Sequence, residues 1–218
     1  MTDIVMLGAG GTCADVLAII AAANVRQPGR WNCLGVLDDA PGFAGARVHG
    51  LPVLGPIQAN QLPAGALAVD CLGSPRSFPA RESLLLARGF DPAAFATIID
   101  DTAWVAHSAQ IGPGSILFPH VVVMANVRLG MHVTVLANSV MNHETTVGDF
   151  TIVASGVNVS GRVAVGRGCY LGSGASIIHD RSIGAGALIG AGAVVVRDVQ
   201  AGSVVAGNPA RVLRGVDQ

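Results

Sequence analysis

The sequence predicts a chain in two parts: an α/β domain with a small parallel sheet of Rossmann type, followed by an all-β domain that winds as a parallel β-helix. In the second half of the chain, an aliphatic residue recurs every six positions, which divides this half into hexads. Glycines recur at every third hexad of that repeat. In the first half, short apolar runs alternate with helical segments, beginning at a glycine-rich turn. We therefore place the first domain at residues 1–99 and the second at residues 100–218.

The composition argues against several functional classes. The 218 residues carry a net charge of −1 and the 13 basic residues are all arginine, which does not indicate a nucleic-acid or membrane-surface partner. The four cysteines form no CxxC pair, so we expect no disulfide framework and no metal site. The first three residues, Met1-Thr2-Asp3, lack the basic start of a signal peptide, and the longest uncharged run is too polar for a spanning helix. These features predict a cytoplasmic protein.

The hexad repeat predicts the β-helix. Stepping by six from Val105 to Val195 meets an aliphatic residue or methionine at all 16 positions. Four residues after each of these lies a small or β-branched residue, and Arg181 is the one exception. Two inward residues separated by one outward residue follow the alternation of a strand, so the rest of each hexad must turn. Three hexads close a triangle, which makes one coil of a solenoid.

One column of glycines shows the coil period directly. Each of these glycines lies three hexads after the one before it, and the column marks one edge of the prism, where a side chain would crowd the turn. They are Gly112, Gly130, Gly148, Gly166 and Gly184.

The first hundred residues predict a small parallel sheet with helices. We expect strands at residues 4–7, 34–37, 67–72 and 97–99, with helices at 14–23 and 81–88. The turn that begins at Gly8 matches a dinucleotide fingerprint only in part, because Cys13 stands at its last glycine position. The turn predicts either a phosphate site at a helix start or a tight turn with no ligand. Asp38 and Asp39 end the second strand, where such sheets bind ligands. The sheet is too short for a conventional NAD site.

The repeat and its ending resemble the hexapeptide acyltransferases, whose β-helix is left-handed. The matching end runs from Asp198 to Arg211, with Gln200 in place of the usual proline. Over residues 1–215 the chain resembles the family of sialic acid O-acetyltransferases and UDP-4-amino-sugar N-acetyltransferases. The shared segments are Gly8-Ala9-Gly10-Gly11-Thr12, Leu37-Asp38-Asp39 and Gly50-Leu51-Pro52-Val53-Leu54-Gly55. Thr12 stands where many members carry histidine.

The resemblance implies an acetyl-CoA-dependent mechanism with catalytic residues in the repeat. Within Asn142-His143-Glu144, it implies that His143 is the general base and that Glu144 supports its basicity. It also implies that Gly161 contacts the acetyl carbonyl. The repeat supports this placement, because His143 lies two residues past the inward Met141, at an outward corner. Gly161 lies three hexads further on, one coil or about 4.8 Å away.

The resemblance also implies the binding residues and the assembly. Coenzyme A contacts map onto Ile152, Gly161, Ser173 and Ala191, with Ile152 in place of a histidine that many members carry. The nucleotide-sugar residues are Gly8, Gly10, Gly11, Thr12, Asp38, Asp39 and Gly73. The family is homotrimeric, with each active site shared between two subunits.

The leading hypothesis is therefore N-acetylation of the amino group of a nucleotide-linked amino sugar for surface-glycan synthesis. O-acetylation of a sialic acid or similar sugar remains an alternative. A non-catalytic, sugar-binding β-helix scaffold is a third reading, which the intact Asn142-His143-Glu144 segment argues against. Among the other histidines, His179 shares the corner of His143 but lies two coils away, too far for a second base. We expect the remaining histidines at the surface or in an interface; they are His49, His107, His120 and His132.

Overall fold

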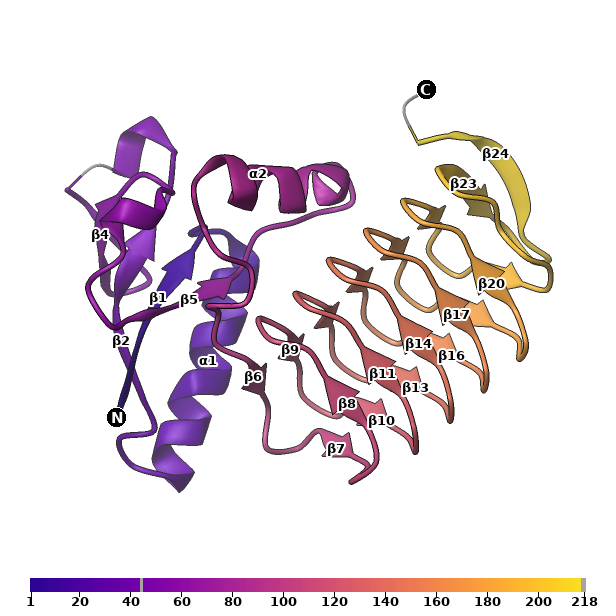
Figure 1. The fold of residues 1–218 in the computed structure, drawn as a ribbon, viewed down its shortest axis with the longest axis horizontal. Coiled ribbons are helices and arrows are strands. Elements are labelled where there is room, and N and C mark those ends of the chain that lie inside the picture. Colours follow the sequence, from indigo (N-terminus) through magenta and orange to yellow (C-terminus); the bar gives the residue numbers. More distant parts are fainter. Residues whose placement is uncertain (44, 217–218) are drawn as a thin grey trace.

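The computed structural model describes residues 1–43 and 45–216, and it shows the two expected parts side by side (Figure 1). A small sheet with two α-helices comes first, and a long three-sided solenoid of short strands follows. The predicted fold class, a Rossmann-like domain followed by a left-handed parallel β-helix, is confirmed. Within the described residues, neither helix combines the length and the apolar character that a membrane span requires.

The first sheet has the order β3-β4-β2-β1-β5. Strands β1, β2, β4 and β5 run parallel, and β3 pairs antiparallel with β4. The strands are β1 (Thr2–Leu7), β2 (Trp31–Leu37), β3 (Arg47–Val48), β4 (Leu51–Gly55) and β5 (Leu67–Asp70). The helices are α1 (Gly11–Arg26) and α2 (Arg81–Ala87), with single 3₁₀ turns at η1 (Pro41–Phe43), η2 (Ala59–Gln61) and η3 (Phe78–Ala80).

Both faces of this sheet are covered, as expected for parallel strands. Ile4 and Met6 of β1 belong to the same buried cluster as Ile20 of α1. The alternate residues, Val5 and Leu7, point to the other face and share a cluster with Leu85 of α2. The central strand is therefore apolar on both sides, which explains its continuous hydrophobic run.

The solenoid has three faces, each a ladder of short strands (Figure 1). Face 1 contains β7 (Trp104–Val105), β10 (Val122–Val123), β13 (Val140–Met141), β16 (Asn158–Val159), β19 (Ser176–Ile177) and β22 (Val194–Val195). Face 2 contains β8 (Gln110–Ile111), β11 (Arg128–Leu129), β14 (Thr146–Val147), β17 (Ala164–Val165) and β20 (Ser182–Ile183). Face 3 contains β6 (Ile98–Ile99), β9 (Ile116–Leu117), β12 (Thr134–Val135), β15 (Ile152–Val153), β18 (Tyr170–Leu171), β21 (Leu188–Ile189), β23 (Ser203–Ala206) and β24 (Arg211–Gly215).

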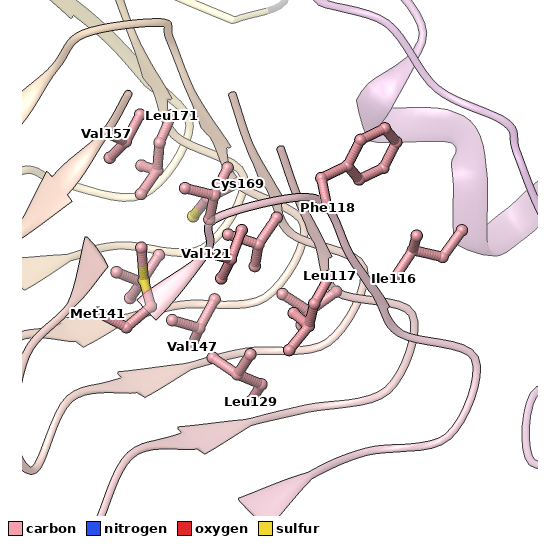
Figure 2. Close-up of a cluster of buried hydrophobic side chains, with 14 of the residues drawn as sticks. Ile116, Leu117, Phe118, Val121, Leu129, Met141, Val147, Val157, Cys169 and Leu171 are labelled. Carbon is pink, nitrogen blue, oxygen red and sulfur yellow. The ribbon is translucent and has the colours of Figure 1, made fainter. Parts of the chain in front are cut away.

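The predicted inward register is confirmed. The aliphatic residue of each hexad is the second residue of its two-residue strand, and from Leu117 to Val195 all of them are buried. Figure 2 shows part of this core, with Leu117, Leu129, Met141 and Leu171 among the side chains that fill it. Inward hydroxyls are satisfied by the neighbouring coil; the hydroxyl of Ser139, for example, donates to the carbonyl oxygen of Ala154 at 2.8 Å.

The corners explain the glycine column. We name the corners by the faces they join: corner 1–2, corner 2–3 and corner 3–1. The periodic glycine column lies on corner 2–3, where consecutive coils approach closely. A side chain at Gly148 would place its Cβ 2.5 Å from the backbone nitrogen of Arg167 in the next coil. These glycines are therefore required by the contact between coils, as the sequence predicts.

Two local features of the first domain differ from the sequence-based expectation. The short strand at 97–99 forms as β6 but pairs with β9, so it is the first rung of face 3 rather than part of the Rossmann-like sheet. The segment Leu51–Gly55, treated only as a family signature, forms strand β4 beside β2. The division at residue 99 remains a prediction, since one buried cluster runs from β1 and α1 into the solenoid.

A buried ionic cluster joins the two parts. Asp70, at the end of β5, accepts hydrogen bonds from Arg81 at 2.8 Å and from the imidazole Nδ1 of His132 at 2.9 Å. All three side chains are almost fully buried. His132 lies on corner 2–3, where its ring stacks on Phe150 of the next coil at 4.6 Å. We expected His132 at the surface or in an interface; it is not at the surface, because the first domain of the same chain covers it.

The environment of His132 determines its hydrogen bonding. Its Nε2 contacts the carbonyl oxygen of Pro92 at 2.9 Å, and a carbonyl can only accept. Burial opposes ionisation of Asp70, yet Arg81 and His132 together hold the pKa of this carboxyl group below its usual range. The ionised Asp70 therefore lies between the Arg81 guanidinium and the His132 ring.

Candidate active site

His143 lies on corner 1–2, between β13 and β14, with its side chain exposed. Its ring leans over Gly161 of the next coil: a Cβ at Gly161 would lie 2.4 Å from both Cε1 and Nε2 of His143. Within the described residues, the imidazole nitrogens of His143 have no hydrogen-bond partner. The ring is therefore held in place by packing on the glycine, and its nitrogens are open to a substrate.

Gly161 has two features that suit the predicted contact with a thioester. Because Gly161 has no side chain, the imidazole of His143 fits directly against it, and Gly161 is buried as a result. Its backbone N–H has no partner within the described part of the chain, although the next residue, Arg162, donates its N–H to the carbonyl oxygen of His143 at 2.9 Å. An unpaired N–H beside a general base can donate to an oxyanion. The structure thus brings His143 and Gly161 together as the repeat predicts.

Glu144 adjoins His143 in sequence, but its hydrogen bond in the structure is with a different residue, Ala125. Its backbone has a left-handed φ of 60°, and its N–H donates to the carbonyl oxygen of Ala125 at 3.0 Å. No hydrogen bond or ion pair joins the Glu144 carboxylate to His143 among the residues that the structure describes. The proposed support of His143 basicity by Glu144 therefore remains a prediction.

Substituting Gly161 with alanine is expected to lower kcat at least ~10-fold, because the added Cβ would displace the imidazole and a shift of about 1 Å can cost up to ~10² in rate. The backbone itself tolerates alanine at this place in the coil, since Ala125 occupies the same corner position two coils earlier. The melting temperature should therefore remain within a few degrees of the wild-type value. Steady-state kinetics with wild-type kcat in this variant would remove Gly161 from the mechanism.

The carboxyl edge of the first sheet gathers most of the predicted sugar-binding residues. Gly8 follows β1, and an added Cβ there would meet Leu72 at 2.8 Å, so this turn lies against the turn that contains Gly73. The N–H of Ala9 donates to the carboxylate of Asp38 at 2.7 Å. Helix α1 begins at Gly11 with no side-chain cap. Parallel strands end at the same edge, so the three turns form one continuous surface.

The start of α1 is suited to an anion. An added Cβ at Gly10 or Gly11 would meet nothing within 4 Å, so the space in front of this turn is open. The N–H groups of Gly10, Gly11 and Thr12 have no partner within the described residues. Free N–H groups at the positive end of a 16-residue helix are suited to accept a phosphate, as the sequence predicts for this turn.

Two side chains near this edge differ from the sequence-based picture. Asp39 turns away from the glycine turn: it accepts from the N–H of Ile57 at 3.0 Å and pairs with Arg88 at 2.9 Å. His49, which sequence reasoning placed at the surface, contacts the carbonyl oxygen of Ala9 through Nε2 at 2.9 Å. It is exposed, but it buttresses the glycine turn, and no sequence motif marks that role.

Two of the cavities between the first domain and the solenoid lie along α1 and the turn before it. The α1 cavity has a volume of about 450 Å³ and is lined by Asp15, Ala18, Ile19, Ala22, Asp100, Phe118, Pro119, Leu136, Ala137 and Ser155. The junction cavity has a volume of about 220 Å³ and is lined by Thr12, Leu72, Gly73, Ser74, Pro75, Thr134, Leu136, Ile152 and Tyr170. Leu136 lines both, so the two cavities adjoin.

The predicted coenzyme A contact Gly161 lies beneath His143, and the other three predicted coenzyme A residues form two groups elsewhere. Ser173 and Ala191 are exposed and stack one coil apart on corner 3–1. Ile152 is buried on face 3, where its Cδ1 would lie 2.7 Å from a Cβ added at Gly73. Within one chain, Ile152 therefore belongs with the sugar-binding edge, and neither group lies on the corner of His143.

Comparison with known proteins identifies the family. No family model matches the sequence. The acetyltransferase domain of PglB from Neisseria gonorrhoeae FA1090, solved in complex with acetyl coenzyme A, is 30% identical, with 97% of this chain and 98% of that chain covered and a TM-score of 0.81. WeeI from Acinetobacter baumannii AYE is 27% identical, with 98% and 100% covered and a TM-score of 0.81. PerB from Caulobacter crescentus, in complex with CoA and GDP-perosamine, shares the fold at 24% identity, 98% coverage of both chains and a TM-score of 0.82.

The chain belongs to the hexapeptide-repeat sugar acetyltransferases. The match extends over both parts of the chain and not only over the repeat, so the first domain is part of the shared architecture. The predicted family and enzyme class are confirmed.

Proposed function

We propose that the protein transfers the acetyl group of acetyl-CoA to the amino group of a nucleotide-linked amino sugar, for the synthesis of a surface glycan. The observation that carries the proposal is the unpaired imidazole of His143 packed on Gly161, in a chain whose other domain has an open phosphate-type turn. The complex of the PglB domain with acetyl coenzyme A supports the choice of donor.

Gly161 and His143 have different roles in the acetyl transfer. The amine nitrogen attacks the thioester carbon, so a C–N bond forms and negative charge develops on the carbonyl oxygen. The N–H of Gly161 donates to that oxygen, and His143 accepts the proton that the nitrogen loses. Collapse of the intermediate breaks the C–S bond, and the proton on His143 passes to the coenzyme A sulfur. The products are an amide and free coenzyme A, with no proton left over.

The outer face of the solenoid supports a trimer. Face 3 is covered by the first domain at its early coils, where Ile116 is fully buried. Face 2 is polar or small on its outer side, with Gln110, Arg128 and Thr146 among its exposed residues. Face 1 differs in its early coils, because Trp104 is 55% exposed and leads an apolar column through the partly exposed Val122 and Val140. The column becomes polar at the next rung, Asn158. An uncovered apolar column of this kind fits a second copy of the chain.

Closing three chains through face 1 would complete the site. Face 1 is bounded on one side by corner 1–2, with His143, and on the other by corner 3–1, with Ser173 and Ala191. Around a threefold axis along the solenoid, corner 1–2 of one chain meets corner 3–1 of the next. His143 would then face the exposed Ser173 and Ala191 of its neighbour, and the groove between them would hold the pantetheine arm. The mass of the protein in solution tests this assembly; a fully active monomer would contradict it.

Release of coenzyme A from acetyl-CoA tests the reaction. We expect release with an amino sugar linked to UDP, dTDP or GDP, and a product heavier by one acetyl group. Release with free sialic acid, and not with any nucleotide-linked amino sugar, would favour the O-acetyltransferase alternative. Binding of a nucleotide sugar without release would favour the scaffold reading.

A further inference from the structure

The α1 cavity lies where the proposed trimer would bring acetyl donor and sugar together. Ser155, which lines it, is on corner 3–1 in the same coil as His143, since one coil runs from β13 through β14 and β15. A threefold axis along the solenoid keeps equal coils at equal height, so His143 of the neighbouring chain would lie at the level of Ser155. The cavity also adjoins the junction cavity, which Thr12 and Gly73 line. A sugar whose diphosphate lies at the start of α1 can therefore extend into it.

One helix face leads from the phosphate turn into this cavity. Thr12, Asp15, Ile19 and Ala22 follow the spacing that places side chains on one side of a helix. Thr12 lines the junction cavity and Asp15 lines the α1 cavity. The two residues are about 4.5 Å apart along the axis at 1.5 Å per residue. Asp15 is therefore the first side chain with a charge that a sugar would meet beyond the phosphate.

The two carboxylates that line the α1 cavity are not equivalent. Asp100 is 7% exposed, and its Oδ1 accepts hydrogen bonds from both the N–H and the hydroxyl of Thr102. It is thus committed to the turn that starts the solenoid. Asp15 is exposed and makes no hydrogen bond or ion pair within the described residues. The rest of the lining is mostly apolar, with Phe118 and Leu136 opposite the helix.

We propose that Asp15 is the residue that selects an amine over a hydroxyl in the acceptor sugar. This inference rests on the proposed function and deepens it. A primary amine is largely an ammonium ion at neutral pH, and a lone carboxylate in a mostly apolar cavity attracts a cation far more than a neutral hydroxyl. The ammonium loses one proton to solvent before reaction. Asp15 then accepts a hydrogen bond from the neutral amine and holds its lone pair toward the thioester beside His143 of the neighbouring chain.

The test compares two sugars that differ at one atom. The probes are a UDP-linked 4-amino-4,6-dideoxyhexose and its 4-hydroxy counterpart, with binding measured by calorimetry on the full-length, coenzyme A-bound protein. We expect Asp15→Asn to weaken binding of the amino sugar about tenfold or more, the usual size of a lost charge-assisted hydrogen bond. Binding of the hydroxy sugar should change no more than about twofold, as for a surface substitution. The preference of the wild-type protein for the amine should therefore collapse.

Asp3→Asn is the matched control. It removes the same charge from the same domain, but at the start of β1, the opposite edge of the sheet, where the Asp3 carboxylate accepts a hydrogen bond from the side chain of Asn32 at 2.8 Å. Equal loss of both sugars in Asp15→Asn would show a structural role and overturn the assignment. Unchanged binding of both, with wild-type acetylation of the amino sugar intact, would overturn Asp15 and leave the proposed function standing. Failure of the wild-type protein to bind or acetylate the amino sugar when it is linked to UDP, dTDP or GDP would instead overturn the proposed function and this inference with it.

Discussion

Replacing His143 with alanine is expected to lower kcat by at least ~10², the contribution of a positioned general base. The imidazole is the one titratable side chain packed on Gly161, and its nitrogens are free to accept the proton of the attacking amine. Nothing else in the described part of the chain can replace it from the same position. Binding of acetyl-CoA should survive, because the corner residues proposed to hold it, Ser173 and Ala191, are untouched. Steady-state kinetics and a binding titration of the two proteins separate these effects.

His179→Ala provides the matched control for that experiment. His179 is an exposed histidine on the same corner, two coils further along, and its Nδ1 contacts Asp180 at 2.6 Å. Asp180 also bonds Arg162, and these contacts, that of Arg162 first, hold the pKa of the Asp180 carboxyl group well below its usual range. The control should retain kcat within a few-fold of wild type. Near-normal turnover in well-folded His143→Ala would show that His143 is not the base.

Replacing Asp70 with alanine is expected to destabilise the protein by about 3–5 kcal/mol, since it leaves the buried guanidinium of Arg81 without its anion and His132 without its acceptor. Arg81 and His132 both lose a partner, and neither can reach water in the folded state. The cluster also connects β5 to the solenoid. The loss of stability should therefore appear as a shift of a single cooperative unfolding transition that includes the first domain and the solenoid. Urea unfolding monitored by circular dichroism measures the change. Asp39→Ala, which breaks a partly exposed ion pair with Arg88, should cost about 1 kcal/mol or less.

The same carboxylate gives the stability a pH dependence. The pKa of Asp70 is lower in the folded chain than in the unfolded chain, where it is about 3.9. Its contribution is therefore complete above about pH 4 and is lost as the pH falls through the lower folded pKa. We expect the urea midpoint to fall more steeply below pH 4 in wild type than in Asp70→Asn. Parallel curves for the two proteins would show that Asp70 is not ionised in the folded state.

The repeat made the solenoid and the catalytic corner predictable, because its geometry follows from periodicity alone. Once three hexads are assigned to a coil, His143 and Gly161 must stack on one corner, and the structure places them there. The phosphate-type turn was predictable for a similar reason, since parallel strands bring Gly8, Asp38 and Gly73 to one edge. In both cases a local sequence pattern is enough to place each residue, and the residues that pack against it do not need to be known.

The contacts between the two parts followed no such pattern. His132 occupies an outward corner position, and only the docking of the first domain, with Asp70 and Arg81, explains why it is buried. Ile98 and Ile99 continue the chain from the first domain, yet they pair with β9 because the repeat needs a first rung. Asp39 adjoins Asp38 in sequence but points to Arg88 instead of the turn. Each outcome depends on a partner distant in sequence, which a single chain read in order does not reveal.

The central claim is that His143 of one chain is the general base for acetylation of a sugar held by the first domain of its neighbour. Mixing two inactive proteins tests it most directly: His143→Ala, and Gly11→Asp, which places a negative charge in the open space before α1. After subunit exchange at equal amounts, about a quarter of the sites in random trimers should combine an intact His143 with an intact turn, and about a quarter of the wild-type activity should return. No activity after exchange confirmed by mass spectrometry would show that each site lies within one chain, and would contradict the account.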